Sequence, residues 1–332
     1  MKALHRIAKW DNAKFLLILL VVIGHFVDLY TKNSASAKSL FLFIYLFHMP
    51  AFIFLAGLFG KRTVREKRYD KILGYFVLFA VMKIFIYMTR ILLGQSPSFK
   101  ILSESGVPWF IFAIAIFYLI TIGLRDYKPQ YVLTVSICLA CFVGYDNAIG
   151  DFLCLSRVIV FYPFFYLGYS LTADEILILA KRVEVRMLSI IFLCVLATLS
   201  IVYIDQLYWL RPLFTGRNPF EKLLYFSEYG CFLRLGWYLA SGLTVLAFLA
   251  VVPERRTFFT ALGSRTIQVY ALHRPVIYIW QVYNIDSFMV AIWPTHWKIL
   301  TLTFSVLLTF LLSTKIFSKP FNWIMNPLVK MS

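Results

Sequence analysis

Long apolar runs, separated by short polar stretches, dominate this 332-residue chain. A helix that crosses roughly 30 Å of hydrocarbon at 1.5 Å per residue needs about 18 to 22 apolar residues. Windows of that length predict an all-α fold with about ten membrane-spanning helices. Their approximate spans are 12–30, 41–60, 73–93, 108–124, 130–145, 155–172, 187–204, 231–252, 265–283 and 298–316. The pattern therefore predicts a polytopic integral membrane protein.

Composition supports this class, because 61% of the residues are hydrophobic and only 15% are charged, outside the range of soluble domains. The sequence contains no internal repeat, low-complexity tract or soluble appended domain. We therefore expect a single membrane domain over residues 1–332. The longest predicted outer connection, 205–230, is the expected extracellular lid.

Lysine and arginine gather in alternate connections between the apolar runs, which predicts cytoplasmic termini by the positive-inside rule. The basic positions are Lys2, Arg6, Lys9 and Lys14; the run from Lys61 to Lys71; Arg125 and Lys128; Lys181, Arg182 and Arg186; and Arg255 and Arg256. The net charge of +17 then reflects topology and an affinity for anionic lipid on the inner face. A nucleic-acid partner is not expected.

The N-terminal segment has a second interpretation. Its basic residues and apolar stretch, followed by Ala-Ser-Ala at 35–37, also fit a cleaved signal peptide. Lys14 and His25 interrupt that apolar stretch, and the later helices need an inward-facing start, which favours a retained helix.

Five cysteines lie in or beside apolar runs, and Cys138 and Cys141 have C-x-x-C spacing. No second pair and no nearby histidine completes a metal site. We therefore expect no metal, and interpret these cysteines as small buried apolar residues.

Three of the five histidines, His25, His48 and His273, lie inside or at the edge of apolar runs. Titratable residues in hydrocarbon are costly and are candidates for function. Lys14 and His25 lie eleven residues apart, within about 20° of one helix face and about 16 Å apart along the axis, which is roughly the reach of a pantetheine arm. Asp11 falls near the same stripe. A snorkelling lysine with an unrelated packing histidine is the alternative.

His48 lies in the second predicted helix at a depth similar to that of His25, so two imidazoles could share one cavity. Pro50 lacks an N–H and should free a backbone carbonyl near His48.

Five ordered motifs resemble the membrane acyltransferase-3 family, and the closest sub-type is similar to bacterial fucose 4-O-acetylases and capsule polysaccharide O-acetyltransferases. They are Trp-Asp-Asn-Ala-Lys at 10–14 with Val-Val-Ile-Gly-His at 21–25; Phe-His-Met-Pro-Ala-Phe at 47–52 with Ala56-Gly57; Pro108-Trp109-Phe110; Arg157 with 162–169; and 262–275. The resemblance implies ten helices in the bacterial cytoplasmic membrane, a cytoplasmic acetyl-CoA or other acyl-CoA donor, and O-acylation of a glycan at the outer half of the membrane.

The chain departs from the family pattern at two motifs. Many relatives carry serine where this chain has Ala56, so a role for that hydroxyl is absent or supplied elsewhere. The basic Arg-x-Arg motif is represented here by Arg65-Glu66-Lys67 with Arg68 beside it. Some relatives also carry an extra soluble domain, and its absence implies that this unit works alone.

Acyl transfer to a sugar hydroxyl needs a base near neutrality, which histidine provides. The expected base is His25, acting directly or through an acyl-enzyme, while His48 orients or polarises the reacting groups. Asp11 is a third candidate catalytic residue, although it could simply form a helix-start ion pair with Lys14. The expected ligands of the CoA phosphates are Lys14, Arg65, Lys67 and Arg68.

Four further residues are candidates for the substrate or the oxyanion. Trp109 and Arg157 could donate to the tetrahedral oxyanion. His273 could instead bond a carbonyl freed by Pro275. Arg274 is costly at mid-membrane depth, so a carboxylate or phosphate partner is expected.

Two other functions compete with this interpretation. A transporter or flippase of lipid-linked glycans would also need intramembrane cations, but it predicts repeat-related halves that the sequence lacks. A multi-spanning acyltransferase built around an Asn/His pair lacks the required spacing. The sequence leaves open the acceptor sugar, the hydroxyl position, the acyl length and the oligomeric state.

Overall fold

The computed structural model describes residues 7–325, and this part of the chain is helical without any strand. Each of the ten predicted segments coincides with a helix, which confirms the all-α prediction. These helices are α1 (Ala8–Asp28), α2 (Ala35–Leu58), α4 (Tyr69–Leu92), α5 (Trp109–Leu124), α6 (Pro129–Phe142), α7 (Leu155–Ser170), α9 (Val183–Val202), α12 (Gly230–Val251), α13 (Thr266–Val282) and α15 (Trp297–Leu312).

The number of membrane crossings is a finer question than the number of helices. Within the described residues, five helices are long and apolar enough to cross a membrane, namely α1, α2, α4, α9 and α12 with the turn before it. A sixth crossing results if α15 and the bent segment after it, up to Phe321, form one span. The apolar helices α5 and α6 are shorter. Several membrane-spanning helices are therefore present, and the count of ten stays a prediction.

Six short helices complete this part of the chain, five between these segments and one after α15. They are α3 (Lys61–Arg65), α8 (Ala173–Lys181), α10 (Ile204–Leu207), α11 (Arg211–Phe214), α14 (Ile285–Ile292) and α16 (Ser318–Ile324). The predicted lid, 205–230, folds into short helical turns that include α11. Its proposed closing role remains a prediction.

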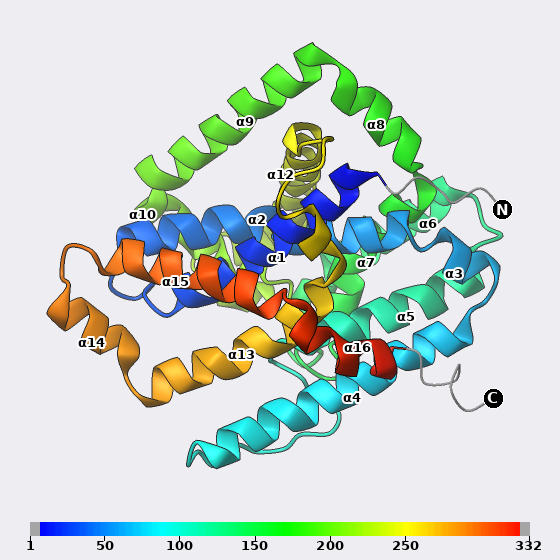
Figure 1. Ribbon diagram of the computed structural model, residues 1–332. Coiled ribbons are helices and arrows are strands. Elements are labelled where there is room, and N and C mark those ends of the chain that lie inside the picture. Colours follow the sequence, from blue (N-terminus) through cyan, green and yellow to red (C-terminus); the bar gives the residue numbers. More distant parts are fainter. Residues whose placement is uncertain (1–6, 326–332) are drawn as a thin grey trace.

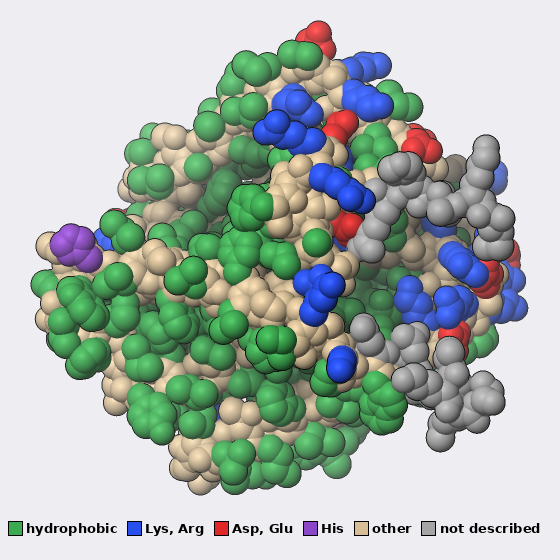
Figure 2. All heavy atoms as spheres, viewed as in Figure 1, with side chains coloured by type: hydrophobic (Ala, Val, Ile, Leu, Met, Phe, Trp, Pro, Cys, Tyr) green, Lys and Arg blue, Asp and Glu red, His purple; other side chains and the backbone are tan. Residues whose placement is uncertain are grey.

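The helices form a bundle in which α1, α2 and α15 run side by side, with α8 and α9 meeting at an angle at the top of the view (Figure 1). Hydrophobic side chains cover the left and lower parts of the visible face, whereas Lys and Arg gather at the right and the top (Figure 2). Such segregation of charge is typical of a protein that exposes most of its flank to lipid.

The start of α1 and the end of α16 lie at the same end of the bundle as α3. Trp10 packs edge-on against Phe59, just before α3, with ring centroids 5.4 Å apart. At the start of α4, Gly74 faces the backbone of Met325. We call this the α3 end; its assignment to the cytoplasm stays a prediction, and Lys2 and Arg6 lie outside the described residues.

Glycines in the family-like motifs allow two helices to touch through their backbones. A Cβ on Gly57 of α2 would collide with the carbonyl oxygen of Phe165, and one on Gly168 of α7 would collide with that of Phe54. The approach is therefore reciprocal, with each helix placing a glycine against the other's backbone. Small residues at such crossings are what membrane helices need for close packing.

The start of α1 is fixed by Asn12, which is fully buried. Its side-chain amide donates to the carbonyl oxygens of Pro253 and Arg255, at 2.9 and 3.0 Å. Its oxygen accepts hydrogen bonds from the hydroxyls of Thr257 and Thr260, at 3.1 and 2.7 Å. One asparagine thus ties α1 to the connection between α12 and α13.

Replacing Asn12 by alanine should destabilise the protein, because it leaves partly buried polar groups of that connection without their partner, at a typical cost of about 1–3 kcal/mol. The measurement is the thermal midpoint of the detergent-purified protein. Asn147→Ala, at an exposed position, is the matched control. An unchanged midpoint for Asn12→Ala would show that water replaces these bonds.

Candidate active site

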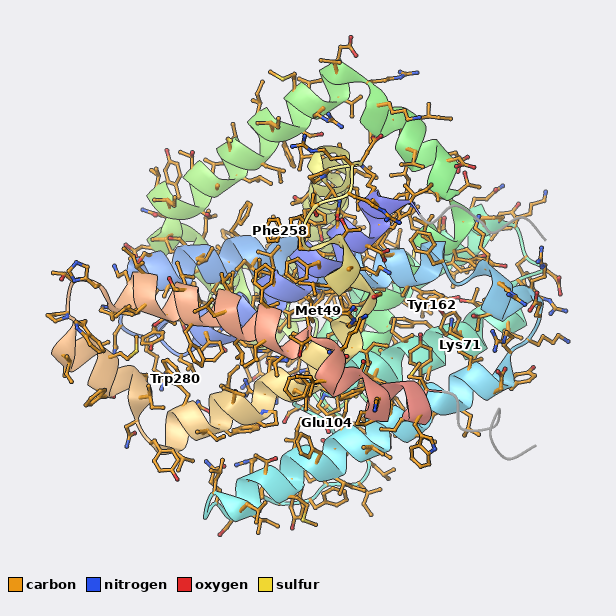
Figure 3. All side chains as sticks on the ribbon, in the orientation of Figure 1. Met49, Lys71, Glu104, Tyr162, Phe258 and Trp280 are labelled. Carbon is orange, nitrogen blue, oxygen red and sulfur yellow. The ribbon has the colours of Figure 1, made fainter. Side chains whose placement is uncertain are left out.

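A polar cavity of about 290 Å³ opens at the end of the bundle opposite α3. We call it the histidine cavity, because His25 of α1 and His48 of α2 both line it. Met49, the neighbour of His48, also lines it and lies near the middle of the molecule (Figure 3). Trp109, Arg157 and Arg274 line it as well. The structure therefore brings together five of the predicted site residues, and confirms that the two imidazoles share a cavity.

The tautomer of His48 follows from its hydrogen bond. Its Nδ1 lies 2.8 Å from the carbonyl oxygen of Ile44, which can only accept, so Nδ1 carries the proton. In the neutral ring, Nε2 then keeps its lone pair. His48 is only 3% exposed, so packing holds this orientation. A histidine fixed in this way can accept a proton at Nε2.

Pro50 has no N–H to donate to the carbonyl of Leu46, which lies one helical turn before it. This is the freed carbonyl that the sequence predicts near His48. The hydroxyl of Ser241 on α12 donates to this oxygen at 2.7 Å. Ser241 is fully buried, so the bond replaces the helical one that proline cannot make. The freed carbonyl thus attaches α12 to the helix that carries His48.

His25 is partly exposed to the cavity and contacts two aromatic rings. The hydroxyl of Tyr45 lies 3.5 Å from its Nδ1. The ring of His273 stacks on it, with centroids 5.2 Å apart. These contacts hold the imidazole at the cavity wall.

His273 of α13 is fully buried behind His25. Its Nδ1 donates to the carbonyl oxygen of Val269 at 3.0 Å, and its buried Nε2 has no hydrogen-bond partner. As the alternative to a substrate or oxyanion role, the sequence predicts a bond from His273 to a backbone carbonyl, and such a bond is present. The acceptor is Val269 rather than Ala271, whose carbonyl Pro275 leaves without its helical donor.

Arg157 of α7 and Trp109 of α5 form one unit in the cavity wall. The guanidinium lies over the indole ring, 5.0 Å from its centroid. It also donates to the carbonyl oxygens of Glu104 and Ser105, at 3.4 and 3.3 Å. Arg157 is only 6% exposed, so the loop before α5 fixes the position of its charge.

A family described as "Acyltransferase domain" matches residues 7–315 of the chain. The chain belongs to this family. It is also similar to the nodulation protein NolL of Mesorhizobium japonicum, with 25% identity over 182 residues, or 50% of this chain and 48% of that protein. The chain thus spans about half the length of this curated relative. No solved structure matches.

Family membership and the apolar helices together show a membrane-embedded acyltransferase. This result favours the enzyme over the transporter alternative. The roles of individual residues rest on the geometry.

Two predicted residues of this acyltransferase, Asp11 and Lys14, lie near the opposite end of α1. Lys14 Nζ is 2.7 Å from a carboxylate oxygen of Asp11, so the helix-start ion pair is present. The helix is continuous from Ala8 to Asp28, which keeps Lys14 and His25 on nearly the same face. Neither Asp11 nor Lys14 lines the histidine cavity.

Arg65, Lys67 and Arg68 also lie at the α3 end, away from the cavity. The side chain of Arg65 is 81% exposed and lies 3.8 Å from Glu66. Lys67 is exposed with a positive φ of 48°, and Arg68 pairs with Asp70 at 2.8 Å. These cations are accessible to a soluble anion, and their predicted role in binding CoA is untested.

Sequence reasoning missed several cavity residues of the acyltransferase. Tyr45 lies three residues before His48, so helical spacing could have placed it on the same face. Asp28 follows His25 by three residues and pairs at 2.6 Å with Arg211, which comes from the segment predicted as a lid. No local pattern signals the contribution of Arg211, because its partner lies 183 residues away.

Proposed function

We propose that this acyltransferase moves an acetyl or other acyl group from cytoplasmic acyl-CoA to a hydroxyl of a glycan at the outer half of the bacterial cytoplasmic membrane. The observation that carries the proposal is the placement of His25 and His48 on one polar cavity at the end opposite α3. The basic positions of the α3 end favour a cytoplasmic location for that end. The cavity then faces outward, toward a surface or lipid-linked glycan.

In the proposed reaction, His25 takes the proton of the sugar hydroxyl as its oxygen attacks the thioester carbonyl. The C–O bond forms, the C–S bond breaks, and the departing thiolate recovers the proton from the imidazolium. His48, with its proton on Nδ1, orients the reacting groups through Nε2. Positioned acid–base groups of this kind typically contribute about 10²–10⁴ in rate.

The oxyanion of the tetrahedral intermediate needs a fixed positive or hydrogen-bonding group. Arg157 supports this role, because its guanidinium lines the cavity and packing holds it over Trp109. Preorganised charges in a water-poor site stabilise developing negative charge at little reorganisation cost.

The donor would enter from the α3 end. Lys14 and His25 lie about 16 Å apart along α1, so a phosphate near Lys14 would let a pantetheine arm extend toward the cavity. The exposed Arg65 and Lys67, with the half-buried Arg68, could bind the nucleotide phosphates or anionic lipid. The protein would use acyl-CoA as its co-substrate.

A reconstitution experiment tests the proposal. Purified protein in proteoliposomes, oriented by protease mapping, would receive acetyl-CoA on one side only and a soluble oligosaccharide on the other. We expect O-acetyl ester in the oligosaccharide, detected by NMR, only when acetyl-CoA faces the α3 end. In cells, deletion of the gene should remove O-acyl signals from the surface glycan. Unchanged acylation with less glycan at the surface would instead indicate a transporter.

A further inference from the structure

A second polar cavity, of about 300 Å³, adjoins the histidine cavity. We call it the vestibule; it lies between α4, the loop before α5 and the segment after α11. Ser105, Gly106 and Arg217 line both cavities, so the two are adjacent and share these residues as a wall. Glu104 of the vestibule lies beside α4 (Figure 3). The vestibule therefore lies directly beside the cavity that holds His25.

An aromatic ring joins the cationic side chains of the two cavities. Arg90 of the vestibule and Arg274 of the histidine cavity both lie over the ring of Tyr278, at 5.5 and 4.9 Å from its centroid. Two like charges at one ring repel each other unless an anion lies nearby. The tyrosine thus marks where a negative group would relieve the repulsion.

Cations outnumber carboxylates on the walls of the two cavities. Seven lysines and arginines line them: Lys83, Arg90, Lys100, Arg157, Arg211, Arg217 and Arg274. Only three carboxylates do so, and each has a cation of its own. The pairs are Asp28 with Arg211 at 2.6 Å, Asp151 with Arg217 at 2.6 Å, and Glu104 with Lys83 at 3.5 Å.

One guanidinium of the histidine cavity remains without a carboxylate partner. Arg157 bonds neutral carbonyls and lies 3.9 Å from Asp151, a carboxylate that it shares with Arg217. Arg274 has no carboxylate within 4.0 Å in the part of the chain described here, and its buried Nε has no hydrogen-bond partner. A charge at this depth is expensive without a partner.

We infer that the acceptor of this enzyme is anionic, and that Arg274 binds its carboxylate or phosphate group. The inference rests on the proposed function and extends it to the class of substrate. Guanidinium groups suit both anions, because their paired N–H donors match carboxylate and phosphate oxygens. A glycan with an acidic sugar, or a sugar linked to lipid through phosphate, carries such a group.

Binding without any acyl donor tests the inference. The full chain in nanodiscs would be titrated by calorimetry with methyl β-D-glucoside, methyl β-D-glucuronide and glucose 1-phosphate. We expect at least one charged sugar to bind about tenfold or more tightly than the neutral glucoside, since tenfold corresponds to about 1.4 kcal/mol. The carboxylate and phosphate probes distinguish the two sources of charge. Equal binding of all three, or binding of none, would overturn the inference.

Substitutions locate the bound charge. Arg274→Gln should abolish most of the preference for the charged sugar, whereas Arg274→Lys should keep part of it. Lys298→Gln removes an exposed cation at the start of α15, outside both cavities, and should leave the preference unchanged. A preference that survives unchanged in Arg274→Gln would contradict the assignment.

Transfer assays separate failure of this inference from failure of the proposed function. Transfer from acetyl-CoA to neutral and charged sugars at equal rates would contradict only the anionic acceptor. Preferential binding of a charged sugar with no transfer to any glycan would instead contradict only the proposed reaction.

Discussion

Replacing His25 by alanine is expected to reduce acyl transfer by about 10²–10⁴, because the sugar hydroxyl then loses its proton acceptor. The loss should fall on kcat, while the KM for acetyl-CoA changes little, since the expected phosphate ligands lie at the α3 end. The measurement is O-acetyl formation by the purified variant at saturating acetyl-CoA. Its fold must be verified by size-exclusion chromatography in detergent.

His296→Ala is a matched control for this experiment. His296 is an exposed histidine outside the histidine cavity, so its loss should leave the rate unchanged. A His25→Ala protein that is folded and fully active would exclude His25 as the base. His48 would then be the stronger candidate, because its proton lies on Nδ1 and its Nε2 is available.

Gly168→Ala is expected to have the largest effect on stability. The added Cβ would collide with the carbonyl oxygen of Phe54, and a backbone atom cannot rotate away as a side chain can. Overpacking typically costs about 1–3 kcal/mol, and this contact should reach the upper end. Gly57→Ala should behave alike, because Gly57 meets the carbonyl of Phe165 at the same crossing. Fluorescence-detected size exclusion after heating measures the loss of folded protein.

Gly123→Ala provides the comparison for these two variants. Gly123 also lies in a helix, but a Cβ there would meet no atom within 4 Å. Its melting profile should match or exceed that of the wild type, since alanine favours helix over glycine. If Gly168→Ala melts like Gly123→Ala, α2 and α7 are separated by more than the structure shows.

The apolar runs were enough to predict the helices. All ten predicted segments are helical, because a window of apolar residues must satisfy its backbone internally in a membrane. The number of membrane crossings was harder to predict than the helices. The helices α7 and α13 are short, and each carries a proline and buried polar residues such as Arg157 and His273. Most residues of α7 are buried inside the bundle, and α13 buries the face that carries His273.

The site was predictable to the extent that its residues share one helix or one motif. Helical spacing gave the ion pair of Asp11 with Lys14, and the chemistry of proline gave the freed carbonyl near His48. The motifs singled out His25, His48, Trp109, Arg157 and Arg274, which line the same cavity. The motif glycines Gly57 and Gly168 had no assigned role until the crossing of α2 and α7 explained them.

By itself, the sequence determined an all-helical membrane protein of the acyltransferase family, and it singled out the candidate residues. The tertiary structure decided what those residues contact. Periodicity fixes positions on one helix, but only packing brings His273 to His25, Arg211 to Asp28, or Arg217 to Asp151. Packing also creates the excess of cations around the histidine cavity and the vestibule, because these lysines and arginines come from five separate segments of the chain.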